Sequence, residues 1–255
     1  MDTIKINRRN AEMIAHRGLS GLETENSIPA FIAAANRSYY GVETDVHVTK
    51  DGRFVIIHDD TTERVAFDSI QIEESSYDLV RKMILKDMCP AAQSEQNTEN
   101  IPVCGQTPDR QDLIVPNLAE YINICKKYGK KCILELKNQF DPDDIRRLTD
   151  EILSLNYLTG TVFISFSLEN LKVLRQFLPK QELYYLTGEY NETVHSDLTQ
   201  YRLHLDIYYR TLTKEIIDQL HSEDILVNCW TCDNKEDAER LTEWGVDFIT
   251  SNILE

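Results

Sequence analysis

Charged side chains alternate within two otherwise apolar segments of the chain. Glu43 and Asp45 lie two residues apart in the segment 41–48, and Glu135 and Lys137 lie two apart in 132–137. Residues two apart on a strand point to the same face. Because burial of an unpaired carboxylate is costly, three such groups on two strands need a compensating cation, and a hard divalent metal meets that need. The alternative is a buried ion-pair network in which Lys137 neutralises a carboxylate.

Two histidines stand at the ends of predicted strands, each beside a charged residue. His16 precedes Arg17, and His58 precedes Asp59. Since the pKa of histidine lies near neutrality, such a pair suits general acid and base chemistry. Arg17 carries a forked, permanent positive charge suited to phosphate or carboxylate, with a surface salt bridge as its alternative role. Trp230, near the end of a later predicted strand, either lines an apolar wall for a substrate or belongs to the core.

The elements that must position these residues alternate along the chain. Short apolar runs predict strands at 13–16, 41–48, 54–58, 132–137, 161–166, 182–186, 205–209, 225–231 and 246–250. Helical patterns occupy 28–36, 116–127, 142–156, 168–178, 213–222 and 234–244. Asp51-Gly52 predicts a hairpin turn, so the run 54–58 returns against 41–48.

Without that return strand, eight strands remain, most of them followed by a helix. This alternation predicts an α/β fold with parallel pairing, and eight units close into a (β/α)8 TIM barrel. An open doubly wound sheet is the alternative. It usually carries a glycine-rich phosphate loop after the first strand, and His16-Arg17-Gly18 is not such a loop. In a barrel, the carboxyl ends of the strands carry the active site, where both histidines would lie.

One segment interrupts the alternation. Residues 60–112 show no clear succession of strand and helix, and 91–100 is a polar run. Long loops without regular structure are uncommon unless they are functional. We therefore expect one domain over 1–255, with an insertion at about 60–112 over the active-site end and a short helix near 77–83.

Composition excludes several classes of function. The 255 residues include 43 acidic and 27 basic side chains, for a net charge of −16. Such an acidic protein is unsuited to nucleic acid or anionic lipid, because both require a basic face. No apolar stretch approaches the roughly 20 residues of a membrane span, and the first ten residues lack the apolar core of a signal peptide. These features predict a cytoplasmic protein with a small-molecule substrate.

Six cysteines are too few for a disulfide framework in a chain of this size. Cys229 and Cys232 have the spacing of a redox pair. They lie in a predicted strand, however, whereas redox pairs usually open a helix. We expect no redox chemistry from them.

An ordered series of short motifs resembles the glycerophosphodiester phosphodiesterase family. The motifs extend over nearly the whole chain. They are His16-Arg17-Gly18, Glu25-Asn26-Ser27, Glu43-Thr44-Asp45-Val46, Thr49-Lys50-Asp51-Gly52, Val55-Ile56-Ile57-His58-Asp59, Glu135-Leu136-Lys137, Trp230-Thr231 and 245–251. No single motif is specific, but their common order is.

The resemblance implies a TIM barrel with a small insertion after the His58 strand, and a site with assigned roles. It implies one divalent ion, Ca²⁺ or Mg²⁺, held by Glu43, Asp45 and Glu135. His16 and His58 would supply acid and base catalysis, and Arg17 and Lys137 would hold the phosphate. Metal-dependent hydrolysis of a glycerophosphodiester such as glycerophosphocholine or glycerophosphoethanolamine would then give sn-glycerol 3-phosphate and an alcohol.

The chain departs from the family pattern at His47, and two other functions compete with the one that the resemblance implies. His47 stands where the family more often carries an uncharged polar residue, so it either joins the pocket as a ligand or lies behind it. A lysophospholipase D would need an apolar groove, for which 60–112 offers few apolar runs. A non-catalytic binding barrel would lack a histidine or carboxylate of the set, and all five are present. The oligomeric state is open between monomer and homodimer.

Overall fold

A computed structural model of the chain describes residues 2–87 and 110–255. Its sheet contains the strands β1 (Glu12–Ala15), β2 (Gly41–Val48), β3 (Phe54–Ile56), β4 (Lys131–Leu136), β5 (Thr161–Ser165), β6 (Leu183–Thr187), β7 (His204–Tyr208), β8 (Val227–Trp230) and β9 (Phe248–Ser251). Its helices are α1 (Ile28–Ala35), α2 (Tyr77–Val80), α3 (Leu118–Tyr128), α4 (Pro142–Ser154), α5 (Leu168–Phe177), α6 (Glu192–Tyr201), α7 (Lys214–His221) and α8 (Lys235–Trp244).

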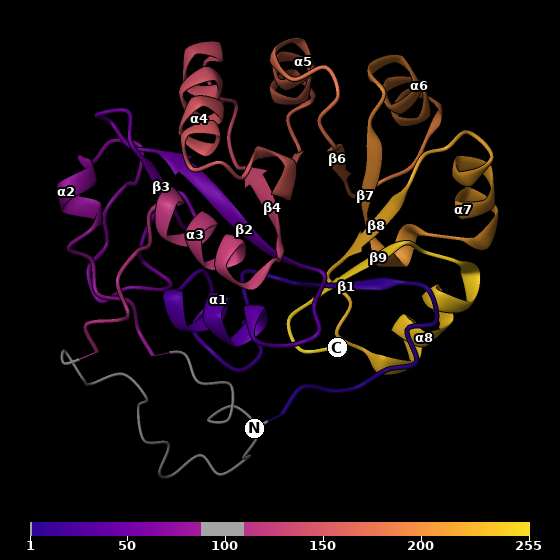
Figure 1. Cartoon of the computed structure of the whole chain (residues 1–255), viewed down its shortest axis with the longest axis horizontal. Helices are drawn as coiled ribbons and strands as arrows, with labels where there is room; N and C mark the ends of the chain where they lie inside the picture. The colour runs from indigo at the N-terminus through magenta and orange to yellow at the C-terminus, as the bar shows by residue number, and fades with distance from the viewer. Residues whose placement is uncertain (1, 88–109) are drawn as a thin grey trace.

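The sheet closes on itself. Every strand of the described chain except β3 pairs in parallel with its neighbours, in the order β1-β9-β8-β7-β6-β5-β4-β2, and β1 also pairs with β2. Helices surround these strands, as Figure 1 shows. The expected (β/α)8 barrel is therefore confirmed, and the open sheet is excluded. β3 is the predicted return strand, antiparallel to β2.

The chain packs in two apolar layers around the strands. Ile14, Ile133, Ile164 and Leu186 belong to a cluster of strand residues. A larger cluster joins strand residues on the opposite face to helix residues, such as Leu134 to Leu171. This arrangement explains why the strands carry apolar residues on both faces. Carboxylates within these strands are therefore exceptions that need a separate explanation.

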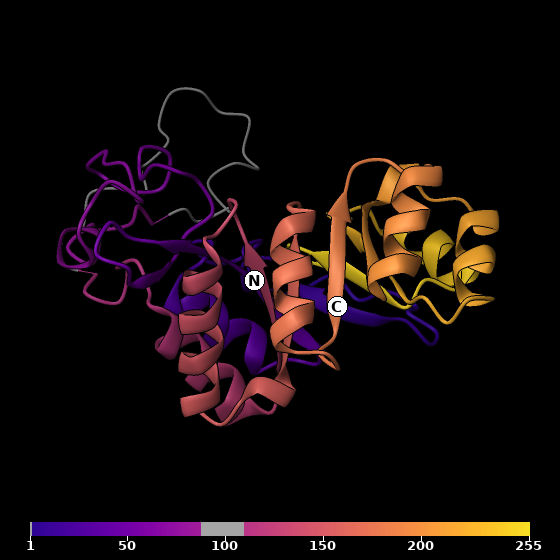
Figure 2. The ribbon, with the colours of Figure 1, turned by 90° about the horizontal axis from the view of Figure 1, so that it is seen from above.

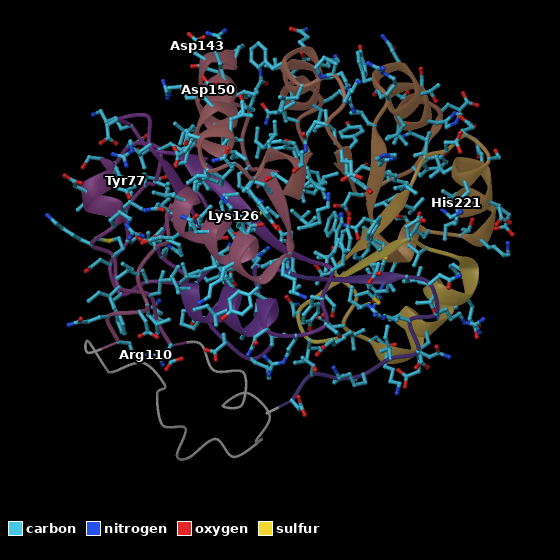
Figure 3. All side chains as sticks on the ribbon, in the orientation of Figure 1. Tyr77, Arg110, Lys126, Asp143, Asp150 and His221 are labelled. Carbon is cyan, nitrogen blue, oxygen red and sulfur yellow. The ribbon has the colours of Figure 1, made fainter. Side chains whose placement is uncertain are left out.

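The outer helices are amphipathic. In α4, Ile145, Leu148 and Ile152 are buried, whereas Asp143 and Asp150 are exposed (Figure 3). Part of the acidic surplus is thus carried by a solvent-facing helix surface, away from the barrel interior. Among residues 2–87 and 110–255, no helix has both the length and the apolar character needed to cross a bilayer.

The segment that follows β3 lies beside the barrel, at the left of Figures 1 and 2. Its described part contains turns and α2, which ends at Val80, so the helix expected over 77–83 is shorter than predicted. A separate apolar cluster, which includes Val65, Ile72, Val80 and Leu113, holds this segment against β3. The polar run 91–100 lies outside the described residues.

Element boundaries differ from the sequence predictions by a few residues. β1 ends at Ala15 and β3 at Ile56, so His16 and His58 occupy the connections just beyond these strands. Both still lie at the carboxyl ends, as expected.

Cys229 and Cys232 are buried free thiols, and burial raises the pKa of Cys232 to about 12. Such thiols are unsuited to redox chemistry at neutral pH.

The connection between β1 and α1 requires glycine at position 18. Gly18 has φ of +75°, and a Cβ there would lie 2.7 Å from the backbone carbon of Ala30. Its neighbour Arg17 also has a left-handed φ of 53°. The close approach of this turn to α1 therefore fixes the backbone that carries Arg17.

We predict that Gly18→Ala lowers the free energy of unfolding by about 2–5 kcal/mol, the sum of left-handed strain and overpacking. Gly129→Ala is the matched control, because Gly129 has φ of +67° but nothing within 4 Å of its added Cβ. The control should lose only about 1–2 kcal/mol. Urea denaturation measures both values, and equal losses would contradict the close-approach explanation.

Candidate active site

A pocket of about 100 Å³ brings most of the predicted site residues together. It is lined by residues from several strands and the connections after them, and these include His16, Arg17, Glu43, His58, Glu135, Lys137 and Trp230. Asp45 lies behind this lining and is 1% exposed. Residues from distant parts of the sequence thus converge at the carboxyl ends of the strands, where active sites of barrels of this type occur.

The register between β2 and β4 crowds three carboxylates. Asp45 pairs directly with Glu135, and Glu43 lies two residues earlier on the same strand as Asp45. One oxygen from each of the three groups lies within 4.8 Å of the others. At an effective dielectric constant of about 20, two unit charges at that distance repel by roughly 3–4 kcal/mol. All three side chains are buried, so solvent screens this repulsion poorly.

The crowding changes the pKa values of the three carboxyl groups. Burial, together with repulsion from Asp45 and Glu135, raises the pKa of Glu43 well above its usual value. Burial and Asp45 likewise raise the pKa of Glu135 to about 8. Burial also opposes ionisation of Asp45, but Arg17 and Lys137 lower its pKa on balance. Without another cation, the cluster therefore favours protons on its two glutamates.

Lys137 and Arg17 approach the cluster but do not saturate it. Lys137 Nζ lies 2.9 Å from Glu135 Oε1 and 3.5 Å from Asp45 Oδ1, and Arg17 Nε lies 3.7 Å from Asp45 Oδ2. Neither Asp45 Oδ1 nor Glu135 Oε1 has a partner in hydrogen-bond geometry. The ammonium of Lys137 is thus in close contact with Glu135 and more distant from Asp45, so a single ammonium is shared between two buried carboxylates.

The residues joined by ion pairs around the three carboxylates carry more negative than positive charge. The acidic members are Glu25, Glu43, Asp45, Asp59 and Glu135, and the permanently charged bases are Arg17, Arg64 and Lys137. With all groups ionised, this described set carries a net charge of −2, which one divalent cation neutralises. The ion-pair network expected as an alternative is present, but its three positive charges leave two negative charges unbalanced when all five carboxylates are ionised. The oxygen donors suit a hard cation, so the triad could bind a metal.

Hydrogen bonds fix the ring of His16. The amide of Asn252 donates from Nδ2 to Asp233 Oδ2 at 2.6 Å, which turns its Oδ1 toward His16. His16 Nδ1 lies 2.8 Å from that oxygen and therefore donates to it. Nε2 is left as the unprotonated nitrogen, 4.0 Å from Glu43 Oε2. Burial, with Arg17 nearby, lowers the pKa of His16 to about 4, so the ring is neutral at pH 7.

His58 is held in the same manner by a carboxylate. Its Nδ1 lies 2.6 Å from Asp59 Oδ1, and a carboxylate can only accept, so Nδ1 carries the proton. Burial lowers the pKa of His58. Partial burial opposes the charge of Asp59, but hydrogen bonds from Arg64 and His58 lower its pKa to about 2. Asp59 is therefore a permanent acceptor, and His58 retains a free Nε2.

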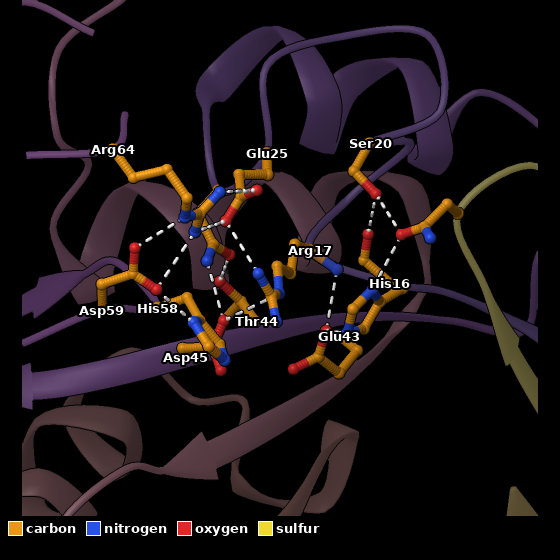
Figure 4. A network of polar contacts seen from close by, with 12 residues as sticks. His16, Arg17, Ser20, Glu25, Glu43, Thr44, Asp45, His58, Asp59 and Arg64 are labelled. Carbon is orange, nitrogen blue, oxygen red and sulfur yellow. Dashed lines mark hydrogen bonds and ion pairs between the residues drawn. The ribbon is translucent and has the colours of Figure 1, made fainter. Parts of the chain in front are cut away.

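A network of arginines and carboxylates surrounds these histidines (Figure 4). The Arg17 backbone N–H donates to Glu43 Oε2 at 2.7 Å, and its Nη1 donates to Glu25 Oε1 at 2.9 Å. Arg64, from the segment after β3, donates to both Glu25 and Asp59. Arg17 is consequently tied to the carboxylates and is 18% exposed at its side chain.

Apolar side chains form another part of the pocket lining. Trp230 lines it together with Ile164, Phe166 and Leu186, and the rings of Phe166 and Trp230 meet edge to face at 5.6 Å. Phe166 is 47% exposed. Trp230 thus lies in the pocket lining, and its contact with a substrate stays a prediction.

Several residues of the site were missed by the sequence analysis. Asp206 lines the pocket from β7, and it shows the same signal as Glu43, a carboxylate within an apolar strand. Asn252 carries no such signal, because its importance arises from contacts across the fold. The family pattern also has an arginine at the position of Arg64, but the resemblance assigned this residue no role. His47 is buried outside the carboxylate group, with Nδ1 3.1 Å from Glu73 Oε1 and Nε2 3.3 Å from the carbonyl oxygen of His58.

Comparisons with known proteins agree with this geometry. The model of the "Glycerophosphoryl diester phosphodiesterase family" matches residues 16–254. The glycerophosphodiester phosphodiesterase of Caldanaerobacter subterraneus subsp. tengcongensis is 27% identical over 242 residues, which cover 94% of this chain and 93% of that protein.

Solved structures show the same fold. A glycerophosphodiester phosphodiesterase from Parabacteroides distasonis superposes with a TM-score of 0.76 at 26% identity, over 95% of this chain and 93% of that one. An Oleispira antarctica phosphodiesterase, solved in complex with the product sn-glycerol-3-phosphate, gives 0.82 at 22% identity, over 97% and 95%. The fold, the match along the sequence and the convergence of the motif residues lead to one conclusion: the chain belongs to the glycerophosphoryl diester phosphodiesterase family.

Proposed function

We propose that this phosphodiesterase hydrolyses glycerophosphodiesters, such as glycerophosphocholine or glycerophosphoethanolamine, to sn-glycerol 3-phosphate and an alcohol. The observation that carries the proposal is the convergence of three carboxylates, two histidines and two cations at one pocket. A phosphodiester is anionic and resists nucleophiles, so its hydrolysis needs positive charge and proton transfer at the same place. Both needs are met by residues of this chain.

Glu43, Asp45 and Glu135 would hold one divalent cation, Ca²⁺ or Mg²⁺. The closeness of their oxygens and the net charge of −2 of the connected residues support this assignment. When bound, such an ion supplies positive charge that stabilises the developing charge on phosphate oxygens. Arg17 and Lys137 would bind the same phosphate from beside the cluster. Their charges act over the short range of the pocket, within which the acidic outer surface is largely screened.

His16 and His58 would move the protons. Each ring donates through Nδ1 to a fixed acceptor, so each has a free Nε2 that can accept a proton. One histidine would enter the step neutral and take on Nε2 the proton of the attacking oxygen, proposed to be the 2-hydroxyl of the glycerol. The other would enter the step as an imidazolium, protonated on both nitrogens, and give its Nε2 proton to the departing alcohol. Water would then open the cyclic phosphate with the two roles exchanged. Asn252 and Asp59 would stabilise the imidazolium or its orientation during this exchange.

Trp230 and Phe166 would contact the apolar part of the released alcohol. A lysophospholipase D reaction remains the second enzymatic possibility, because the same wall could contact an acyl chain. A substrate panel distinguishes them: glycerophosphocholine and glycerophosphoethanolamine should be hydrolysed far faster than lysophosphatidylcholine. The cytoplasmic location, a monomer or homodimer, and the absence of nucleic-acid or membrane partners stay predictions from the sequence.

Removal of divalent metal should abolish the reaction. With excess EDTA, we expect release of glycerol 3-phosphate from glycerophosphocholine to fall at least about 100-fold, and added Ca²⁺ or Mg²⁺ should restore it. Glu43→Gln should raise the metal concentration for half-maximal activity by at least about tenfold. Glu169→Gln, an exposed pair with Lys172, is the control and should titrate like wild type. Full activity in EDTA would exclude the metal.

Loss of either histidine should slow turnover without unfolding the protein. His16→Ala and His58→Ala should each lower kcat by at least about 100-fold, the usual contribution of general acid or base catalysis. His195→Ala is the matched control, since His195 pairs with Glu223 outside the pocket. Steady-state kinetics and circular dichroism measure the two effects. A wild-type kcat in either site variant would assign that histidine a structural role only.

A further inference from the structure

Arg64 makes an unusual double connection within the described site. Its Nη1 and Nη2 donate to the two oxygens of Glu25 at 2.7 and 2.8 Å. Its Nε and Nη2 donate to the two oxygens of Asp59 at 2.7 and 3.1 Å. One guanidinium from the segment after β3 thus forms a forked contact with each of two carboxylates (Figure 4).

Each of these carboxylates holds a different functional group. Glu25 accepts from Arg17 Nη1 at 2.9 Å, and Asp59 accepts from His58 Nδ1 at 2.6 Å. We propose that Arg64 is a positioning residue, which orients the anion-binding Arg17 and the acid-base His58 through Glu25 and Asp59. The inference rests on the proposed function and goes beyond it, because it assigns a task to the segment that interrupts the barrel.

Charge and exposure favour a positioning role over a stabilising one. Arg64 is 42% exposed at its side chain, and exposed ion pairs contribute little to folding. Without Arg64, Glu25 and Asp59 would lose a shared donor. Asp59 could then turn away from His58, and the imidazole would no longer be held with its proton on Nδ1. Groups that orient a reactive ring in this manner typically change activity by about 10–100-fold.

The test compares two arginines of the same segment. Arg64→Gln should lower kcat at least tenfold, with a smaller change in KM, whereas Arg81→Gln should keep wild-type kcat. Arg81 is the control because it also makes a forked contact, but its partner is Glu120, which holds neither Arg17 nor His58. Arg64→Ala should recover part of its kcat in millimolar guanidinium. A wild-type kcat in Arg64→Gln, an equal loss in Arg81→Gln, or no recovery with guanidinium would overturn the proposal.

A second measurement does not require turnover. In ¹⁵N-histidine-labelled protein, the ring shifts of His58 should report a proton on Nδ1 in wild type and a mixture of tautomers in Arg64→Gln. Unchanged ring shifts would reject the positioning role. If wild type hydrolyses no glycerophosphodiester but the tautomer responds, the proposed function fails while the connection through Asp59 stands.

Asp206, on β7, lines the same pocket. The residue is 1% exposed, its Oδ1 has no hydrogen-bond partner, and no cation among the described residues offsets its charge. Burial, partly opposed by Asn228, raises the pKa of its carboxyl to about 7. A buried carboxyl without a full set of partners destabilises the fold, so a bound ligand would supply what the protein does not.

We infer that Asp206 binds an uncharged hydroxyl of the substrate, the terminal hydroxyl of its glycerol. A hydroxyl both donates and accepts, which matches a carboxyl that is partly protonated near neutral pH. A quaternary ammonium offers no N–H or O–H to the open oxygen, so the headgroup of glycerophosphocholine is the poorer fit. This inference also rests on the proposed function. Asp206 pairs with Leu186 on β6, and Tyr208, two residues later on β7, pairs with Trp230, so the carboxyl lies beside the apolar wall and nearer the amino ends of the strands.

A substrate lacking that hydroxyl isolates the contact. Asp206→Leu should raise KM for glycerophosphocholine at least tenfold but leave unchanged the KM for the analogue built on propane-1,2-diol 1-phosphate. The variant should also unfold at a higher urea concentration than wild type, because an unpaired buried carboxyl is gone. An equal effect on both substrates, or none on either, would reject the contact. An inactive wild type would instead reject the proposed function. An unfolding midpoint of Asp206→Leu at or below that of wild type would contradict the premise that the buried carboxyl destabilises the fold.

Discussion

Mutual repulsion among Glu43, Asp45 and Glu135 is the constraint on which the rest of the site depends. Three buried carboxylates within 4.8 Å cannot all be ionised without added positive charge. Lys137 and Arg17 supply part of it, and the connected residues still carry a net charge of −2 when ionised. The barrel therefore concentrates buried carboxyl groups that require either bound protons or another cation, at the pocket where the substrate is proposed to bind.

Barrel geometry makes this arrangement possible. The parallel register sets Asp45 beside Glu135, while the strand period places Glu43 on the same face as Asp45. The turn after β1, fixed by Gly18, presents His16 and Arg17 to that face. Rigid strands thus carry the carboxylates, whereas connecting segments carry the histidines and the arginines. This division lets the segment after β3 contribute Arg64 without disturbing the sheet.

The residues within strands could be predicted from the sequence, because their signal is local. A carboxylate inside an apolar run is rare, so Glu43, Asp45 and Glu135 were identifiable, and Asp206 should have been identified by the same rule. Eight strands alternating with helices predicted the closed barrel correctly. The helix expected over 77–83 was too long, since the segment after β3 folds around its own small apolar cluster.

Contacts between segments distant in sequence could not be predicted in this manner. Glu25 and Asp59 belong to the family motifs, but the motifs do not give their contacts, and only the folded chain shows that they and Arg64 join Arg17 to His58. Asn252 gains its importance from the closing of β9 against β1, far from His16 in sequence. His47 shares a strand with Asp45, but its contacts are with Glu73 and the backbone of His58, and strand periodicity alone could not decide between the two roles expected for it.

The central claim is that the three crowded carboxylates share a cation, and anomalous diffraction tests it most directly. Crystals grown with Mn²⁺, which scatters anomalously and prefers the same oxygen ligands, should show one peak within roughly 2.0–2.6 Å of oxygens from Glu43, Asp45 and Glu135. A map without a peak at this position at millimolar Mn²⁺, with the ammonium of Lys137 alone between the carboxylates, would contradict the account.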